Sequence, residues 1–252
     1  MNEKKPKTTR GIVAMLDALG IRNASNEEID KFISFMPTME EFTKMINMVY
    51  AGSHLSLEGL GKEENFSIFR FGDTILLVWK NASQHDEMIG LVPIAQVLSK
   101  VIILGLSKGI RLRGAVSIGE MILDDRTVLG PVINDVASWY DKTEFIGVVA
   151  TPQCGQLLSY RKLNPVTEDS TDEKMFKREF DASFQKYDVP IKGNSTQKLW
   201  VVNWPNKITS KNQDRLGWYF DRTRKLSIPF GTEQKYENTE RFVVEMLKRG
   251  EA

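Results

Sequence analysis

The feature that most constrains this fold is a pair of β-rich runs, residues 66–71 and 74–79, with only Gly72-Asp73 between them. Two residues allow a tight turn and nothing longer, so the runs must pair as neighbouring antiparallel strands. Glycine permits the backbone conformation that such a turn requires, although Asp-Gly is the commoner order. The pattern therefore predicts a β-hairpin with Asp73 at or just after its turn.

The hairpin stands within a regular succession of predicted strands and helices. A continuous apolar run over residues 11–16 predicts a buried strand that ends at Asp17, and apolar residues at helical spacing follow it. After the hairpin, residues 87–107 predict a long helix and residues 112–118 another strand. This βαββαβ order is that of the ferredoxin-like motif. We expect an α+β sandwich with helices on one face of the sheet, followed by a C-terminal extension.

The rest of the chain indicates a single domain with a C-terminal extension. Residues 1–10 are basic and are expected to be a disordered tail, with 11–252 as a single domain. Its core is expected over about 11–150 and 199–204, with the charged segment 161–188 as an excursion outside it. Smaller signals predict helices that begin at Gly130-Pro131 and Thr151-Pro152, strands over 145–150 and 199–203, and a C-terminal helix that includes 241–248.

Composition excludes several classes of function. The 34 Lys and Arg residues nearly balance the 33 Asp and Glu residues, so no strong overall field attracts nucleic acid or a membrane surface. One cysteine and two histidines can form neither an intramolecular disulfide nor a standard zinc site. No apolar run approaches the ~20 residues of a membrane-spanning helix. We expect a cytoplasmic protein that binds neither nucleic acid nor membranes.

The predicted order of strands and helices would place Asp17 near Asp73. In the ferredoxin-like arrangement the first strand lies beside the hairpin, so the end of that strand approaches the hairpin turn. Two close carboxylates repel each other unless a cation lies between them, and hard oxygen ligands select Mg²⁺ or Mn²⁺. Two such ions suit phosphoryl transfer. On spacing alone, a turn residue or a helix cap remains the alternative for each aspartate.

Four motifs, in this order along residues 11–150, resemble those of the class III nucleotidyl cyclases. They are Asp17-Ala18-Leu19-Gly20, Phe71-Gly72-Asp73, the strand over 113–120 that ends in Gly119-Glu120, and the helix over 129–137 that carries Asn134. Within that family the chain is most similar to the bacterial anti-phage pyrimidine cyclases of the Pycsar systems. The run from Gly130-Pro131 to Ile146-Gly147-Val148 and the segment over 187–192 carry that similarity.

The resemblance implies a homodimer with its sites at the interface, which converts UTP or CTP to a 3′,5′-cyclic monophosphate and pyrophosphate. Two divalent cations, Mn²⁺ or Mg²⁺, would be held by Asp17, Asp73 and the carbonyl of Ala18, and Asn134 would contact the ribose. The cyclic UMP or cyclic CMP would act on a separate effector in antiviral defence. The alternatives are an adenylate or guanylate cyclase, and a catalytically degenerate module that only binds nucleotides or dimerises.

Two positions depart from the purine cyclases of that family. Their base-reading lysine, four residues before the second aspartate, is matched by Phe69, and their base-reading aspartate is matched by Thr127. Phe69 could stack on a small base or simply belong to the core, and both interpretations remain open. The departures favour a pyrimidine. We favour UTP over CTP because that activity is the commoner one among the relatives.

A third departure concerns the transition-state arginine of the family, which is matched here by Ser138. Loss of such a charge donor commonly costs ~10²–10³ in rate. Arg113, Arg111 or Arg70 could replace it through bidentate contact with phosphate, and we favour Arg113 as the catalytic residue, with Arg70 as a substrate ligand.

Overall fold

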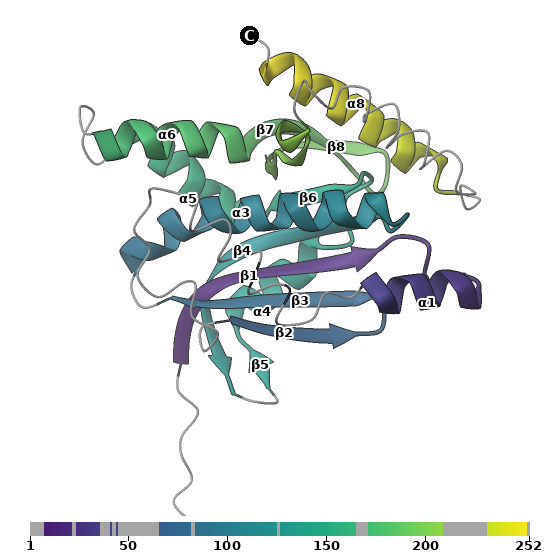
Figure 1. Cartoon of the computed structure of the whole chain (residues 1–252). Helices are drawn as coiled ribbons and strands as arrows, with labels where there is room; N and C mark the ends of the chain where they lie inside the picture. Colours follow the sequence, from purple (N-terminus) through teal and green to yellow (C-terminus); the bar gives the residue numbers. More distant parts are fainter. Residues whose placement is uncertain are drawn as a thin grey trace, which may run out of the picture.

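The computed structural model describes residues 8–21, 24–35, 41, 44, 66–81, 84–124, 127–164, 171–208 and 231–250 of the 252 residues. One mixed sheet forms the centre of the molecule, with helices on both of its faces (Figure 1). The strands are β1 (Thr8–Ala18), β2 (Phe66–Phe71), β3 (Thr74–Asn81), β4 (Leu112–Leu123), β5 (Val128–Leu129), β6 (Gly147–Ala150), β7 (Phe184–Ile191) and β8 (Ser195–Val202). The helices are α1 (Asn26–Phe35), α3 (Gln84–Ser107), α4 (Pro131–Trp139), α5 (Pro152–Leu163), α6 (Thr171–Ser183), the 3₁₀ helix η3 (Trp204–Lys207) and α8 (Glu233–Gly250).

The sheet begins with the predicted ferredoxin-like arrangement. Its order is β2-β3-β1-β4-β6-β8-β7, and β5 pairs with the far end of β4. The first four strands pair antiparallel, whereas β6 joins β4 in parallel, as a strand does after a helical crossover. The α+β fold class is therefore confirmed. The register places Asp17 opposite Thr74 on one side and opposite Arg113 on the other.

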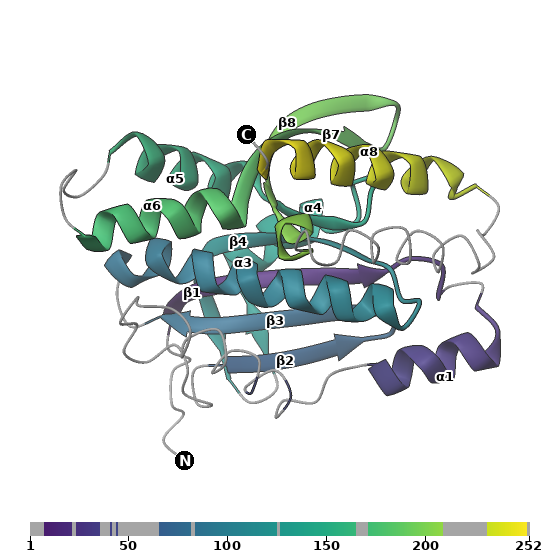
Figure 2. The ribbon, with the colours of Figure 1, turned by 45° about the horizontal axis from the view of Figure 1, so that its top comes forward.

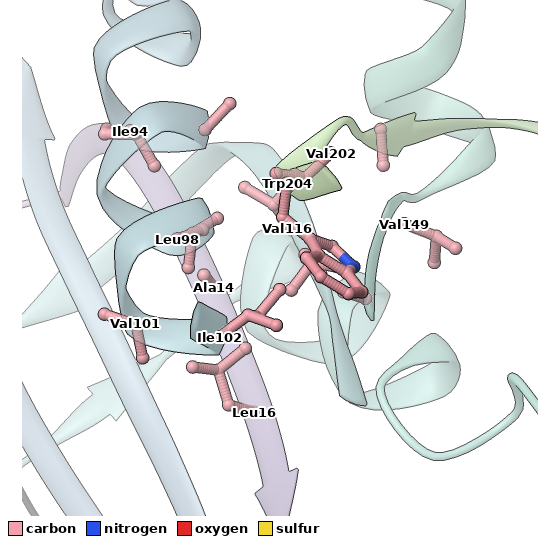
Figure 3. Packing of buried hydrophobic residues seen from close by; sticks show 14 of the residues in the cluster. Ala14, Leu16, Ile94, Leu98, Val101, Ile102, Val116, Val149, Val202 and Trp204 are labelled. Atoms are coloured by element: carbon pink, nitrogen blue, oxygen red, sulfur yellow. The ribbon is translucent and has the colours of Figure 1, made fainter. Parts of the chain in front are cut away.

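Two layers of helices cover the sheet. Helix α3 lies across one face, where Leu98 and Ile102 point toward Leu16 and Val116 (Figure 3). Helix α4 packs on the opposite face, because it contacts Ser117, which alternates with Val116 along β4. The expectation of helices on a single face was therefore wrong for α4. One stretch within α3, Gly90–Ser107, is long and apolar enough to cross a membrane, but most of it is buried in this core.

The segment expected as an excursion outside the core contributes to it instead. Helix α6 places Phe176 and Phe180 among the buried residues, and β7 adds Phe184 and Tyr187 before pairing with β8. The aromatic ring of Phe180 meets the Trp200 ring edge-on, with 5.4 Å between the ring centroids. The charged residues of 161–188 obscured this, since α6 is amphipathic and only one of its faces is apolar.

Both ends of the chain extend further into the fold than expected. Strand β1 begins at Thr8, so 8–10 belong to the sheet and only 1–7 of the predicted tail lie outside the described residues. Helix α8 begins at Glu233 and docks through Phe242, which is fully buried. The Phe242 ring lies 5.0 Å from the Tyr187 ring and 5.1 Å from the Phe145 ring. The C-terminal helix is thus part of the core.

Candidate active site

The C-terminal end of β1 and the turn of the β2–β3 hairpin meet at one end of the sheet, beside α1 (Figures 1 and 2). The backbone N–H of Ala18 donates a hydrogen bond of 3.1 Å to the carbonyl of Asp73. Gly72 has a φ of 59°, and Asp73, the second turn residue, does not have a positive φ. Positive φ at the first position alone is the pattern of a type II′ turn, which explains the Gly-Asp order. The structure therefore brings Asp17 and Asp73 together.

Helix α1 is the first helix after β1, and a capping box forms its N-terminus. The Glu28 backbone N–H donates to the Ser25 hydroxyl at 3.3 Å, and the Ser25 backbone N–H donates to the Glu28 carboxylate at 2.9 Å. This arrangement satisfies two amide donors that a helix start leaves unpaired. Ser25 is therefore the N-cap of α1.

The Asp17 carboxyl group lies where negative charge is disfavoured. Burial is the largest influence and raises its pKa above the ordinary value, while the nearby Arg113 guanidinium acts in the opposite direction. The negative charges of Asp73 and Asp141 raise the pKa of Asp17 further, because like charges disfavour its ionised form. A cation bound at this end of the sheet would offset both the cost of burying the Asp17 carboxylate and its repulsion by the other acids.

Arg113 forms the closest contacts of Asp17. Its Nε group donates a hydrogen bond of 3.0 Å to the Asp17 Oδ2 atom, and its Nη2 group forms an ion pair with the same oxygen at 2.9 Å. Its Nη1 group donates to the Thr143 carbonyl at 3.0 Å. The Arg113 side chain is 9% exposed and also lies 3.8 Å from Glu144. Glu144 in turn pairs with Lys235 of α8 at 3.1 Å. All three guanidinium nitrogens are thus used inside the protein, and the catalytic role of Arg113 stays a prediction.

The donor set suits a hard divalent cation in part. Asp17 and Asp73 supply carboxylate oxygens, although Arg113 already occupies Oδ2 of Asp17. Across the residues that the structure describes, no group of three or more His, Cys, Asp or Glu side chains converges as in an all-protein metal site. Mg²⁺ and Mn²⁺ sites at triphosphates commonly use one or two carboxylates together with water and phosphate oxygens. The two aspartates fit that pattern, with the Ala18 carbonyl as a predicted further ligand.

A pocket of about 600 Å³ opens beside the hairpin turn. Apolar side chains of α1 and the loop before it form one wall, and the hairpin forms the other. Arg70 and Asp73 supply the charged groups, and the full lining is Ile21, Ile29, Phe32, Ile33, Arg70, Gly72 and Asp73. The pocket is large enough for part of a nucleotide, with an apolar wall for a base or sugar and a cation for phosphate.

Phe69 lies on the sheet face that carries Asp17. Phe69 pairs with Leu76, and Asp17 pairs with Thr74. Leu76 and Thr74 are two residues apart on β3, so all four side chains lie on the same face of the sheet. Arg70 points to the other face by the same alternation. Phe69 is partly buried and packs against the core. Its role in base recognition stays a prediction.

Helix α4 presents Asn134 and Ser138 on its exposed side. The Ser138 hydroxyl donates to the Asn134 carbonyl at 2.7 Å. Sequence reasoning missed their neighbour Asp135, whose Oδ2 accepts hydrogen bonds from Ser117 at 2.5 Å and from Thr151 at 2.6 Å. Both hydroxyl-bearing side chains are fully buried. A single acid after Asn134 in the sequence carried no signal of this contact, because its partners lie on β4 and before α5.

Helix α8 also reaches the site, which no sequence pattern indicated. Besides the ion pair of Lys235 with Glu144, the Asn238 side chain donates to the Glu144 carbonyl at 2.8 Å. Arg111, a buried residue just before β4, lies over the Tyr236 ring at 4.8 Å from its centroid. Burial lowers the pKa of Arg111 and raises the pKa of Tyr236 to about 12. The C-terminal helix therefore frames the charged groups behind Asp17.

Comparisons with known proteins give weak similarities only. No protein-family model matches the chain, and no curated protein matches it. Among solved structures, the adenylyl cyclase CyaB from P. aeruginosa is 11% identical, with a TM-score of 0.42 over 78% of this chain and 94% of that one. The catalytic core of a rhodopsin-guanylyl cyclase with converted specificity, in complex with ATPalphaS, is 12% identical, with a TM-score of 0.38 over 78% and 96%. An adenylate/guanylate cyclase/hydrolase from Silicibacter pomeroyi is 13% identical, with a TM-score of 0.38 over 78% and 97%.

Proposed function

We propose that this protein is a nucleoside triphosphate cyclase of the class III type. The observation that carries the proposal is the hydrogen bond between Ala18 and Asp73, which holds Asp17 and Asp73 at the same end of the sheet. Asp73 also lines a pocket beside the hairpin turn, together with Arg70 and apolar side chains that suit part of a nucleotide. Two of the four motifs that resemble the cyclase family, 17–20 and 71–73, meet at this end of the sheet, and the fourth falls on α4. The strand over 113–120 begins here beside Asp17 and carries Gly119-Glu120 to the opposite end.

In the proposed reaction the 3′-hydroxyl of the substrate attacks its own α-phosphate in line, and pyrophosphate leaves. Divalent cations, when bound, would activate that hydroxyl and neutralise charge on the triphosphate. Asp17 and Asp73 would hold the cations, with the Ala18 carbonyl as a further ligand. Arg70, on the pocket wall, would bind phosphate oxygens, and the apolar wall of α1 would exclude water. Asn134 would orient the ribose.

We further propose a pyrimidine substrate, UTP or CTP. Phe69 and Thr127 stand where purine cyclases carry charged base-reading groups, and the Thr127 backbone N–H is already engaged by Asp124 at 2.7 Å. The exposed positions of Asn134 and Ser138 support a homodimer in which α4 serves the site of the partner. The setting would be the cytoplasm, with a cyclic nucleotide product that acts on a separate antiviral effector.

The proposal is tested by incubating the purified protein with Mn²⁺ and each of the four ribonucleoside triphosphates. We expect cyclic UMP or cyclic CMP with equal amounts of pyrophosphate, and loss of product in Asp17→Asn and Asp73→Asn. Asp188→Asn is the matched control, because Asp188 is exposed on β7, at the far edge of the sheet. Intact dimers that form no cyclic nucleotide from any triphosphate would refute the function, and cyclic AMP or GMP as main product would refute the pyrimidine preference.

A degenerate nucleotide-binding module is the second candidate. The observation that favours it is the engagement of all three Arg113 nitrogens within the protein, while Ser138 stands in place of the transition-state arginine. This candidate predicts nucleotide binding that survives Asp17→Ala and Asp73→Ala, without turnover. Equilibrium binding of a fluorescent UTP analogue to these variants separates it from the cyclase.

A further inference from the structure

We propose that Arg113 is a built-in counter-cation of Asp17, which neutralises this carboxylate when no metal is bound and thereby weakens divalent-cation binding. The inference rests on the proposed function, in that it takes Asp17 as a cation ligand. It adds that this chain stabilises its empty site with its own guanidinium. Arg113 is on this view a positioning residue that competes with the ion, and it does not act on the triphosphate.

The geometry of the pair supports this role. Two guanidinium nitrogens converge on one oxygen, with distances to the Asp17 Oδ2 atom of 3.0 Å from Nε and 2.9 Å from Nη2. A charge-assisted hydrogen bond of this kind is a strong one, and both contacts are made to the same carboxylate oxygen. The side chains of Arg113 and Asp17 are 9% and 14% exposed, so water screens the pair little.

The Arg113 guanidinium is also fixed by contacts on the side away from Asp17. Its Nη1 group donates to the Thr143 carbonyl at 3.0 Å, and Glu144 lies 3.8 Å away. Glu144 is itself fixed by two residues of α8, through Lys235 at its carboxylate and Asn238 at its carbonyl. A guanidinium tied to a buried backbone carbonyl does not swing out to follow a substrate. It stays beside Asp17 in either state of the site.

A divalent cation bound to Asp17 would therefore lie close to a fixed positive charge. That repulsion weakens ion binding, and Arg113 also withholds one of the two carboxylate oxygens. Replacing Arg113 by a neutral side chain of similar length removes both effects. We expect Arg113→Met to bind Mn²⁺ more tightly, on the order of tenfold. We also expect the variant to be less stable without metal, because Asp17 would then be left buried and unpaired.

The chain offers a matched control in Arg161. Its guanidinium bonds to Glu173 at 2.6 Å, and the two side chains are 8% and 12% exposed, almost as in the Arg113–Asp17 pair. The Arg161 pair joins α5 and α6, which lie at the opposite end of the molecule from α1 (Figure 2). Arg161→Met should lower the melting temperature in a similar way, but it should leave Mn²⁺ affinity unchanged.

The experiment measures Mn²⁺ binding by isothermal titration calorimetry and by thermal shift, without nucleotide. Recovery of melting temperature with Mn²⁺ should be larger in Arg113→Met than in the wild type or in Arg161→Met, and it should vanish when Asp17→Asn is added. If Arg113→Met does not fold, Arg113→Gln provides a second neutral variant. Unchanged or weaker Mn²⁺ affinity in the neutral variant, or no Mn²⁺ binding in any form, would overturn the inference.

This readout is independent of turnover. A protein that makes no cyclic nucleotide, yet gains Mn²⁺ affinity in Arg113→Met, loses the proposed function and keeps this inference. A protein that makes cyclic nucleotide, and whose Mn²⁺ affinity does not respond to Arg113, keeps the function and loses the inference.

Discussion

Asp135 joins α4 to the sheet through two buried hydroxyl groups, and its removal should be costly. The Ser117 and Thr151 hydroxyls donate to the same Oδ2 atom at 2.5 and 2.6 Å, and both side chains are fully buried. Hydrogen bonds to a charged group contribute about 1.5–3 kcal/mol each. In Asp135→Ala, one hydroxyl can still donate to the other across 3.0 Å, so one donor remains unsatisfied. We expect a loss of about 2–4 kcal/mol in the free energy of unfolding.

Urea denaturation followed by tryptophan fluorescence measures this loss. Asp135→Asn keeps an acceptor oxygen and should lose about half as much, because the charge is gone but the hydrogen-bond geometry remains. Glu120→Ala provides a control, since that side chain is exposed and its ion pair with Arg10 spans 3.5 Å. In a double-mutant cycle, Ser117→Ala should cost less in the Asp135→Ala background than alone. A loss below about 1 kcal/mol in Asp135→Ala, or additive effects, would refute the coupling of the three residues.

Three further predictions test the frame of the site. Gly72→Ala should cost about 1 kcal/mol through backbone strain, because the φ of Gly72 is 59° and, among the described residues other than its chain neighbours, none has an atom within 4 Å of the added Cβ. Gly72→Asn should cost less, and equal losses in urea denaturation would contradict this. Gly114→Ala should cost roughly 3 kcal/mol or more, or prevent folding, since the added Cβ would lie 2.2 Å from the Met15 carbonyl oxygen, and a soluble variant of wild-type melting temperature would refute it. The pKa of Tyr236 is raised to about 12, so its neutral form favours the folded state, and the stability that it contributes is present below pH 10 and lost as the pH rises toward 12. Unfolding by urea at pH 9 and pH 11.5 should show a smaller loss in Tyr236→Phe than in the wild type.

Local signals were strongest where chain connectivity leaves few choices. The two-residue link at Gly72-Asp73 requires a hairpin, and the structure has it, with glycine at the position that needs positive φ. Thr151 caps α5 as its sequence indicated, with its hydroxyl accepting from the Cys154 N–H at 3.3 Å. The ferredoxin-like order followed from the succession of strands and helices, because short antiparallel connections and helical crossovers admit few arrangements.

The predictions from sequence were wrong where a segment has one apolar face among many charged residues. The sequence of α6 predicts a polar excursion because most of its residues are charged or polar, yet Phe176 and Phe180 face the core. The predicted tail likewise reached into the sheet, because Arg10 keeps its side chain partly exposed while its backbone pairs with strands on both sides. Average composition over a segment hides which face is buried, and only the packing partners reveal it.

The amino-acid sequence by itself determined the hairpin, the antiparallel centre of the sheet and the approach of Asp17 to Asp73, because these depend on contacts between neighbouring elements. Only the tertiary structure decided what surrounds Asp17. Arg113 comes from β4, Thr143 from the segment before β6, and Lys235 from α8, and no periodicity links positions so far apart in the chain. The charge balance at Asp17 therefore depends on long-range packing, which local pattern cannot encode.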